Sequence, residues 1–220
     1  MLITAEHIKN NPTIKTYIQK ADASLGAMGF TEHAFAHAAR CAETAKYILL
    51  KTGHSERDAE LAYIAGYMHD IGNVINRHDH AQSSAIMAFR ILDNMGMPAD
   101  ELSTIITAIG NHDESTAFPV NDIAAALILA DKTDVRRTRV RNRDFAKFDI
   151  HDRVNYSVYQ SETLISEDNT RLILSLEIDP DLCSVMEYFE IFLDRMILCR
   201  KSAEVLNLHF NRIINGQQLL

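Results

Sequence analysis

The stretch HAARCAETAKYILLKTGHSERDAELAYIAGYMHDIGN, residues 37–73, contains two segments whose apolar residues recur at helical spacing. Gly53 separates the two segments, and a glycine in this position is typical of a helix end. The first segment begins at His37. The second ends at His69-Asp70, one turn after the small residue Gly66, which lets a neighbouring helix approach closely. The stretch therefore predicts two packed helices that carry imidazole and carboxylate groups at their ends.

The helical pattern continues on both sides of this stretch. The spacing predicts helices over residues 12–29, 32–52, 56–70, 80–95, 98–112 and 122–135, separated by short turns. Thr31, Ser55, Asp79 and Asn121 are expected to cap the helices that follow them, because their side-chain oxygens can accept hydrogen bonds from free amides of the first turn. A proline opens the first and the fifth of these helices.

The pattern changes after about residue 150. Residues 153–165 and 170–179 alternate apolar and polar side chains and are rich in Val, Tyr, Leu and Ile, which predicts a β-hairpin. Pro180-Asp181 then opens a long helix over residues 182–206. We therefore expect a mainly α fold, in which a helical domain over residues 1–145 carries a smaller C-terminal hairpin and helix, residues 146–220, docked on it.

Composition narrows the class of protein. The net charge of −8 over 220 residues argues against general nucleic-acid binding, because neutralising phosphates needs a basic surface. Cys41, Cys183 and Cys199 lie far apart, which fits a reduced, cytoplasmic protein without a disulfide framework or a thiolate zinc site. The longest clean apolar run, residues 123–130, is too short to span a bilayer. We expect no membrane association.

Several histidines and aspartates lie at helix positions that face the protein interior. His112 is stacked over Ile105 and Ile109 by helical spacing, and Asp131 follows Leu127 and Ile128 on its own face. A carboxylate is rarely buried unless it is paired or binds a metal. The predicted ligands of a first metal are His37, His69, Asp70 and Asp131, and those of a second are Asp70 as a bridge with His80 and His112. Nitrogen and oxygen ligands of this kind suit iron, manganese, cobalt, nickel or zinc, and magnesium suits them less well.

The ordered set His37, His69-Asp70 and Asp131 resembles the HD superfamily of metal-dependent phosphohydrolases, over about residues 31–140. The segment AALILADKTDVRR, residues 125–137, resembles the helix that bears the last aspartate. The segments HAQSSAIMAFRIL, residues 80–92, and AIGNHDE, residues 108–114, look like the additional histidine segments of two-metal members. The resemblance implies a helical bundle with one or two divalent metals per chain, and a nucleotide or another phosphate mono- or diester as the substrate.

The sequence departs from the family pattern at two places. Asn73 follows His69-Asp70 and a glycine where family members often have lysine. The segment HDESTAFP, residues 112–119, resembles the HHE…GYP signature of the cyclic-di-GMP phosphodiesterase branch only distantly. Asp113 stands in place of the second histidine, and residues 117–119 read Ala-Phe-Pro. Cyclic-di-GMP is therefore not predicted as the substrate.

Other polar residues near these segments are candidates for contact with substrate or for proton transfer. The cation-rich run over residues 131–147 is either a phosphate clamp or a solvated helix end, and within it Lys132 and Arg136 are the best candidates for substrate contact. His33 is expected at the mouth of the site and His78 on the surface near it. Asp70 would bridge the metals, and His78, Glu114 or Lys132 would protonate the leaving oxygen.

The resemblance leaves three functions open. The first is a phosphohydrolase that acts on a small phosphorylated substrate. The second is a non-hydrolytic metal- and nucleotide-binding sensor, which the missing lysine at Asn73 and the C-terminal appendage would suit. The third is a di-iron oxygenase, because some HD proteins use this ligand set for oxygen chemistry. A homodimer is a further hypothesis, and gel filtration tests it.

Overall fold

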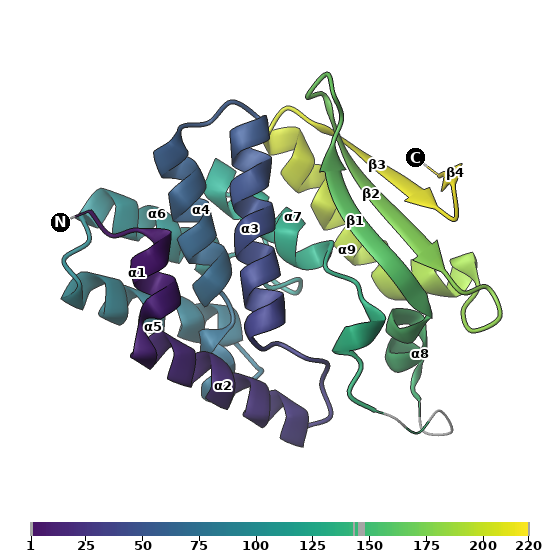
Figure 1. Cartoon of the computed structure of the whole chain (residues 1–220), viewed down its shortest axis with the longest axis horizontal. Helices are drawn as coiled ribbons and strands as arrows, with labels where there is room; N and C mark the ends of the chain where they lie inside the picture. Colours follow the sequence, from purple (N-terminus) through teal and green to yellow (C-terminus); the bar gives the residue numbers. More distant parts are fainter. Residues whose placement is uncertain (1, 143, 145–147, 220) are drawn as a thin grey trace.

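The computed structural model describes residues 2–142, 144 and 148–219, in which a helical bundle lies beside a four-stranded sheet (Figure 1). The bundle contains α1 (Ala5–Asn10), α2 (Pro12–Ala27), α3 (Phe35–Lys51), α4 (Glu56–Met68), η1 (Ile71–Val74), α5 (His80–Asn94), α6 (Ala99–Gly110), α7 (Asp122–Lys132) and η2 (Arg137–Arg139). The expected boundary between residues 145 and 146 lies outside the described residues. The prediction of a mainly α fold is confirmed.

The two helices of the opening stretch, α3 and α4, pack closely against each other. A Cβ atom at Gly66 of α4 would lie only 2.8 Å from the Cα atom of Ala42 in α3, so a larger residue there would push the helices apart. The neighbouring α7 is buried on all sides from Ile123 to Ala130. The site residues described below therefore lie at the ends of helices that are held in a tight core.

The predicted helix caps are confirmed in two of the four cases. Ser55 accepts a hydrogen bond from the Asp58 amide, and Asn121 accepts one from the Ala124 amide. The prediction for Thr31 is wrong, because α3 begins only at Phe35. The prediction for Asp79 is also wrong.

Asp79 precedes α5 in a left-handed backbone conformation, with φ at 56°. An N-cap residue normally has an extended backbone, which aims its side chain at the amides of the first turn. The Asp79 carboxylate makes no such bond and instead lies 2.7 Å from Nδ1 of His78.

The C-terminal part contains α8 (Ile150–Ser157), β1 (Val158–Ile165), β2 (Arg171–Ile178), α9 (Val185–Val205), β3 (His209–Ile214) and β4 (Gln217–Gln218). The predicted hairpin is present as β1 and β2, which pair in antiparallel fashion. Its first strand is shorter than expected, because Asp149 caps α8 by accepting a hydrogen bond from the Asp152 amide. The long helix α9 begins at Val185 with a capping box of Ser184 and Glu187, rather than at Pro180.

The sheet has the order β1-β2-β3-β4, and the last two strands were not predicted. β2 and β3 are parallel, with α9 as the connection between them. The α9 helix packs on α7, and β1 lies along α3, where Arg40 donates a hydrogen bond to the Ser161 carbonyl. Within the described part of the chain, none of the helices has both the length and the apolar character to cross a membrane.

Candidate metal centre

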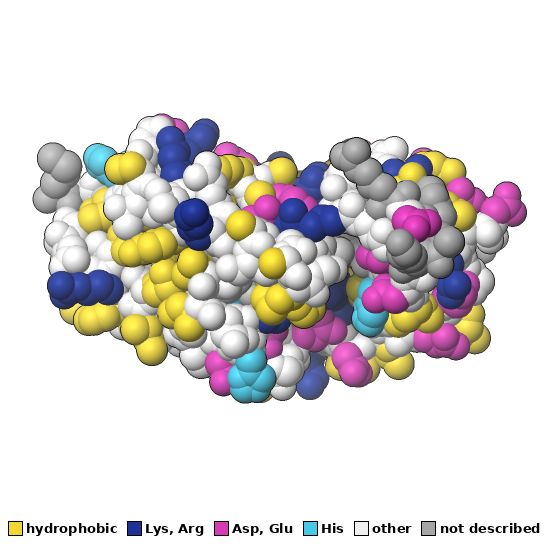
Figure 2. Space-filling view, turned by 90° about the horizontal axis from the view of Figure 1, so that it is seen from below, with side chains coloured by type: hydrophobic (Ala, Val, Ile, Leu, Met, Phe, Trp, Pro, Cys, Tyr) yellow, Lys and Arg dark blue, Asp and Glu magenta, His cyan; other side chains and the backbone are white. Residues whose placement is uncertain are grey.

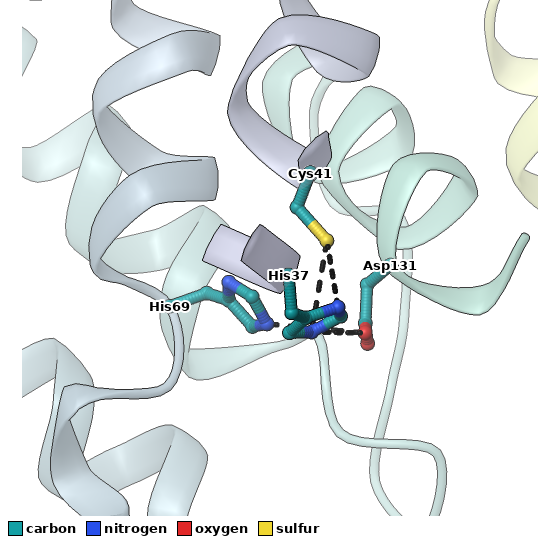
Figure 3. Close-up of side chains that lie close together, drawn as sticks. All are labelled: His37, Cys41, His69 and Asp131. Atoms are coloured by element: carbon teal, nitrogen blue, oxygen red, sulfur yellow. Dashed lines mark hydrogen bonds and ion pairs between the residues drawn. The ribbon is translucent and has the colours of Figure 1, made fainter. Parts of the chain in front are cut away.

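Three helix ends bring the ligands predicted for the first metal together. His37 lies in the first turn of α3, His69 directly follows α4, and Asp131 lies in the last turn of α7. The Nε2 atom of His37 lies 3.6 Å from Oδ2 of Asp70 and 3.4 Å from Oδ1 of Asp131. In Figure 3, the side chains of His37, His69 and Asp131 point toward one another from three different helices. These residues, which are far apart in the sequence, thus form one cluster in space.

The remaining two histidines approach the same carboxylate from the other side. Nε2 of His80, the first residue of α5, lies 3.4 Å from Oδ1 of Asp70. Nε2 of His112, which follows α6 by two residues, lies 3.9 Å from the same oxygen. All four histidine rings are buried. Asp70 therefore lies between the pairs His37–His69 and His80–His112, as expected for a bridging carboxylate.

Local hydrogen bonds orient three of these rings in the same way. Each ring donates its Nδ1 proton to the backbone carbonyl three residues earlier. The bonds are His69 to Gly66 at 2.8 Å, His80 to Arg77 at 3.1 Å and His112 to Ile109 at 2.6 Å. Because Nδ1 carries the proton, Nε2 keeps its lone pair and directs it into the cluster. Neutral imidazoles held in this orientation are suited to bind a metal ion.

His37 is oriented by a carboxylate that sequence reasoning missed. Its Nδ1 lies 2.8 Å from Oδ2 of Asp134, whose side chain is fully buried. The signal that could have found Asp134 is its position one helical turn after Asp131. Burial alone would raise the Asp134 pKa, but the hydrogen bonds from His37 and Arg136 outweigh it and hold the pKa far below its usual range. Asp134 is therefore a charged partner for the first ligand.

The residues present fit a bound cation. Nε2 of His69 is buried and makes no hydrogen bond, although it lies 3.2 Å from an Asp70 oxygen. Asp131 pairs with Lys132 at 2.6 Å, but Asp70 has no Lys or Arg within ion-pair distance in the described part of the chain. Burying an anion without a cation is costly. A buried carboxylate without a Lys or Arg partner, beside an imidazole nitrogen that makes no hydrogen bond, is the arrangement that a metal ion would satisfy.

Two groups of side chains have ligand atoms that all lie within 4.8 Å of one another, namely His37, Cys41, His69 and Asp131, and His69, Asp70 and His112. Cys41 was not predicted as a ligand. Its Sγ lies 3.5 and 3.6 Å from the two ring nitrogens of His37, and burial raises its pKa well above the usual value for a thiol. Cys41 therefore packs on the His37 ring as a neutral thiol.

Burial also sets the charge of the other groups. It lowers the pKa of His112 to about 3, so this imidazole is neutral at pH 7. Burial opposes ionisation of Asp70, but the surrounding histidines, His69 above all, outweigh it and hold the Asp70 pKa well below its usual value. The centre thus combines the neutral imidazole of His112 with the ionised carboxylate of Asp70, and both are the protonation states of metal ligands.

A cavity of about 410 Å³ opens beside the cluster. Its inner wall contains Asp70, His80, His112 and Asp131, and its outer wall comes from the segment before α3, from α8 and from α9. Figure 2 shows charged and histidine side chains gathered near the hollow in the middle of this face. The C-terminal part of the chain thus forms one wall of the candidate site.

Three of the other predicted site residues line this cavity. The His33 ring lies 5.3 Å from the His37 ring, and its Nδ1 donates to the Thr31 carbonyl at 2.7 Å. Lys132 is buried against Asp131, and Glu114 accepts a hydrogen bond of 3.1 Å from Nε of Arg195. The positions of His33, Lys132 and Glu114 suit the predicted roles, which stay predictions.

Two of the predicted substrate contacts lie outside this cavity wall. His78 is exposed, pairs with Asp79 and is absent from the cavity wall. Arg136 is also absent from that wall, because both Nε and Nη2 of its guanidinium bind the Asp134 carboxylate, at 2.6 and 2.9 Å. Neither position supports contact with a substrate in this cavity.

Residues 34–153 match the family model of the HD domain. This chain belongs to the HD domain family. Its HD domain covers more than half of the chain, and the family predicted from the sequence is confirmed. The match extends through the first residues of α8, so it includes the segment that carries Asp149 and Asp152 on the outer wall of the cavity.

This chain is similar to a known protein sequence and to a known crystal structure. The chain is 28% identical over 173 residues to an uncharacterized protein of Methanocaldococcus jannaschii, a match that covers 68% of this chain and 66% of that protein. It also resembles the crystal structure of a predicted HD superfamily hydrolase from an uncultured Thermotogales bacterium. That match has 24% identity and a TM-score of 0.45 and covers 56% of this chain and 67% of the other.

Proposed function

We propose that this HD-domain protein is a metal-dependent phosphohydrolase, which acts on a nucleotide or another small phosphate mono- or diester. The observation that carries the proposal is the His69 Nε2 atom, which makes no hydrogen bond, beside the Asp70 carboxylate, which has no Lys or Arg partner in the described part of the chain; Asp70 lines an open cavity. The same cavity is lined by Arg77, Lys132 and Arg195, which can attract and bind an anion despite the net charge of −8.

The metal proposed here is iron, manganese, cobalt, nickel or zinc. When bound, such a metal lowers the pKa of a water molecule and neutralises charge on the phosphoryl group. The imidazoles and the ionised carboxylates supply the nitrogen and oxygen ligands that these metals accept. Asp70 lies between the two histidine pairs and would be a ligand of the metal.

A proton must reach the leaving oxygen when the ester bond breaks. Lys132 and Glu114 both line the cavity, whereas His78 does not. The Lys132 ammonium is buried and lies 2.6 Å from Asp131, so it is held beside the ligands. Glu114 accepts a hydrogen bond from Arg195, whereas the ammonium of Lys132 carries its protons beside Asp131, so Lys132 is the better proton donor in this arrangement. Substitution of Lys132 by Met should therefore reduce turnover more than Glu114→Gln.

A sensor without catalysis is the second candidate, and the position of Asn73 favours it. Asn73 is fully buried and donates hydrogen bonds to the backbone and side-chain oxygens of Asp70. It therefore fixes Asp70 and does not reach the cavity as a phosphate ligand. A sensor of this kind would bind a nucleotide tightly without hydrolysing it.

Metal content and turnover together test these proposals. Elemental analysis of the purified protein is expected to find one to two metal ions per chain, and His69→Ala with Asp70→Ala should abolish binding. His209→Ala, an exposed histidine on β3, is the matched control and should keep the metal. A panel of phosphate esters and nucleotides with Mn²⁺, Co²⁺, Ni²⁺ or Mg²⁺ then tests hydrolysis.

The possible outcomes separate the candidate functions. A wild-type protein that binds no transition metal would contradict the phosphohydrolase. Tight nucleotide binding without turnover with any metal would favour the sensor, and iron-dependent oxygen consumption would favour the oxygenase. The homodimer stays a prediction, and elution at the mass of a monomer in gel filtration would contradict it.

A further inference from the structure

Arg77 reaches the nitrogen of His80 that faces the site. Its Nη1 atom lies 3.3 Å from Nε2 of His80 and 3.4 Å from Oδ1 of Asn73. The side chain is half-buried and lines the cavity, and its guanidinium lies 5.7 Å from the centre of the Phe30 ring. An aromatic face at this distance holds a cation by electrostatic attraction. The guanidinium is therefore positioned inside the site rather than in solvent.

Arg77 differs from the other cations of the cavity in its partners. Lys132, Arg139 and Arg195 pair with Asp131, Asp134 and Glu114, respectively. Arg77 has no carboxylate within ion-pair distance in the part of the chain that the structure describes. Its positive charge is thus the one least neutralised by the protein among these four cations. An anionic ligand of the cavity would find its strongest unoccupied partner here.

The turn before α5 brings Arg77 and His80 together. Asp79 holds the left-handed conformation in this turn, and His80 Nδ1 donates to the Arg77 carbonyl at 3.1 Å. The His80 proton is therefore on Nδ1, and the lone pair of Nε2 accepts from the Arg77 guanidinium. A metal ion at His80 would need the same lone pair. Arg77 in this position and a metal ion bound to His80 are mutually exclusive.

His80 lies beside Asp70 but outside the tighter groups of candidate ligands. Neither of the two groups whose ligand atoms lie within 4.8 Å of one another includes it. Asn73, which stands where family members often have lysine, is bound to Asp70, and Arg77 lies one helical turn further along the chain. The cation missing at residue 73 is thus present four residues later, beside His80.

We propose that Arg77 supplies the second positive charge of this site, in place of a second metal ion at His80, and binds the phosphate group of the substrate. The part that concerns the substrate rests on the proposed function. Guanidinium can bind phosphate through two parallel hydrogen bonds, which a point charge cannot do. The site then holds one metal ion on the side of His37, His69 and Asp131, and Arg77 on the side of His80.

Counting bound manganese tests the first half of this proposal. Metal-free protein is titrated with Mn²⁺, and the electron paramagnetic resonance signal of free Mn²⁺ gives the number of ions bound per chain. We expect one ion for the wild type, two for Arg77→Met, and one for Arg90→Met, an exposed arginine on α5 that serves as the matched control. Two ions in the wild type, or equal numbers in wild type and Arg77→Met, would overturn the proposal.

Binding of inorganic phosphate tests the second half. Calorimetric titration of the proteins loaded with one Mn²⁺ ion per chain is expected to show at least about ten-fold weaker phosphate binding for Arg77→Met than for wild type, because a charge-assisted hydrogen bond is lost. Arg77→Lys should restore part of the affinity, and Arg90→Met should leave it unchanged. Equal phosphate affinity in Arg77→Met and wild type would overturn the assignment. Matching thermal melting curves of the variants establish that the fold is retained.

Failure of this proposal can be told apart from failure of the proposed function, because neither measurement needs turnover. If the protein binds one metal ion, binds phosphate through Arg77 and hydrolyses no ester, the role of Arg77 is supported and the phosphohydrolase is contradicted. If the protein hydrolyses an ester with two metal ions bound, the phosphohydrolase is supported and the role of Arg77 is contradicted.

Discussion

His37 and Asp134 form a buried pair in which the Nδ1 atom of the imidazole lies 2.8 Å from a carboxylate oxygen. Arg40, Arg136 and Arg139 surround the same carboxylate, at 3.1, 2.6 and 3.7 Å. These arginines keep Asp134 ionised and in place, and Asp134 keeps the His37 proton on Nδ1. The three cations therefore act on the metal centre through two intervening side chains.

Replacement of Asp134 by Asn is expected to weaken metal binding by about 10- to 100-fold, as loss of a carboxylate behind a ligating histidine typically does. Titration with Mn²⁺ measures the change. Arg136→Gln is the control, because it removes one arginine and leaves the contact between His37 and Asp134 intact, so its effect should be smaller. Equal metal affinity in Asp134→Asn and wild type would show that the pair does not support the centre.

The close approach of α3 and α4 at Gly66 leads to a second prediction. Gly66→Ala should lower the free energy of unfolding by about 2 to 3 kcal/mol, because the new methyl group meets the Ala42 backbone, which cannot rotate away. Denaturant unfolding measures the loss. Gly110→Ala, where the nearest atom would be 3.6 Å away, should be neutral or slightly stabilising. A Gly66→Ala protein as stable as wild type would contradict the packing described.

The tip of the β1–β2 hairpin should respond to pH. Hydrogen bonds from Ser166 and Thr170 lower the pKa of Asp168 to about 2, below its ordinary value. Because the folded-state pKa is the lower one, the charged carboxylate stabilises the fold above about pH 4, and this contribution is lost as the pH falls toward 2.

Asp168→Asn should therefore be less stable than wild type at pH 7, and the difference should shrink as the pH falls to 2. Thermal melting across this range measures it. The neighbouring Glu167→Gln removes a charge of the same sign, and its carboxylate accepts no hydrogen bond from the described residues. It should show no comparable trend, and a constant difference for Asp168→Asn would argue against the assignment.

A buried arginine in β3 gives the fourth prediction. Arg212 is 1% exposed, and its Nε and Nη1 atoms make no hydrogen bond within the described part of the chain. Burial lowers its pKa, and the Phe189 ring lies 4.7 Å from the guanidinium. Arg212→Met should therefore stabilise the protein by about 1 to 3 kcal/mol, because a costly buried charge is replaced by an apolar side chain. A lower melting temperature would show that ring stacking outweighs this cost.

Much of the candidate site could be predicted because it depends on local patterns. Helical spacing alone indicated that His112 and Asp131 point inward, and both lie in the cluster. The same periodicity could not reveal Arg77, whose position depends on the left-handed backbone of Asp79. The pairing of Asp134 with His37 could not be read from local spacing either, because the two residues are 97 positions apart in the chain.

The missed strand β3 has a different cause. Alternation of apolar and polar residues is the usual sign of a strand, and here the inward positions are Phe210, Arg212 and Ile214. A charged residue at the central inward position interrupts that pattern. In addition, β3 pairs in parallel with β2 across the whole of α9, a long-range contact that local spacing does not encode.

The parallel pairing of β2 and β3 has a consequence for folding during synthesis. Phe192 and Arg195 line the cavity from α9, and α9 lies between the two paired strands in the chain. A ribosome-bound chain that has released the helices up to α7 can form the imidazole and carboxylate cluster, but β3 leaves the ribosome only after α9. We expect the outer wall of the cavity to be completed last, after the cluster that it covers.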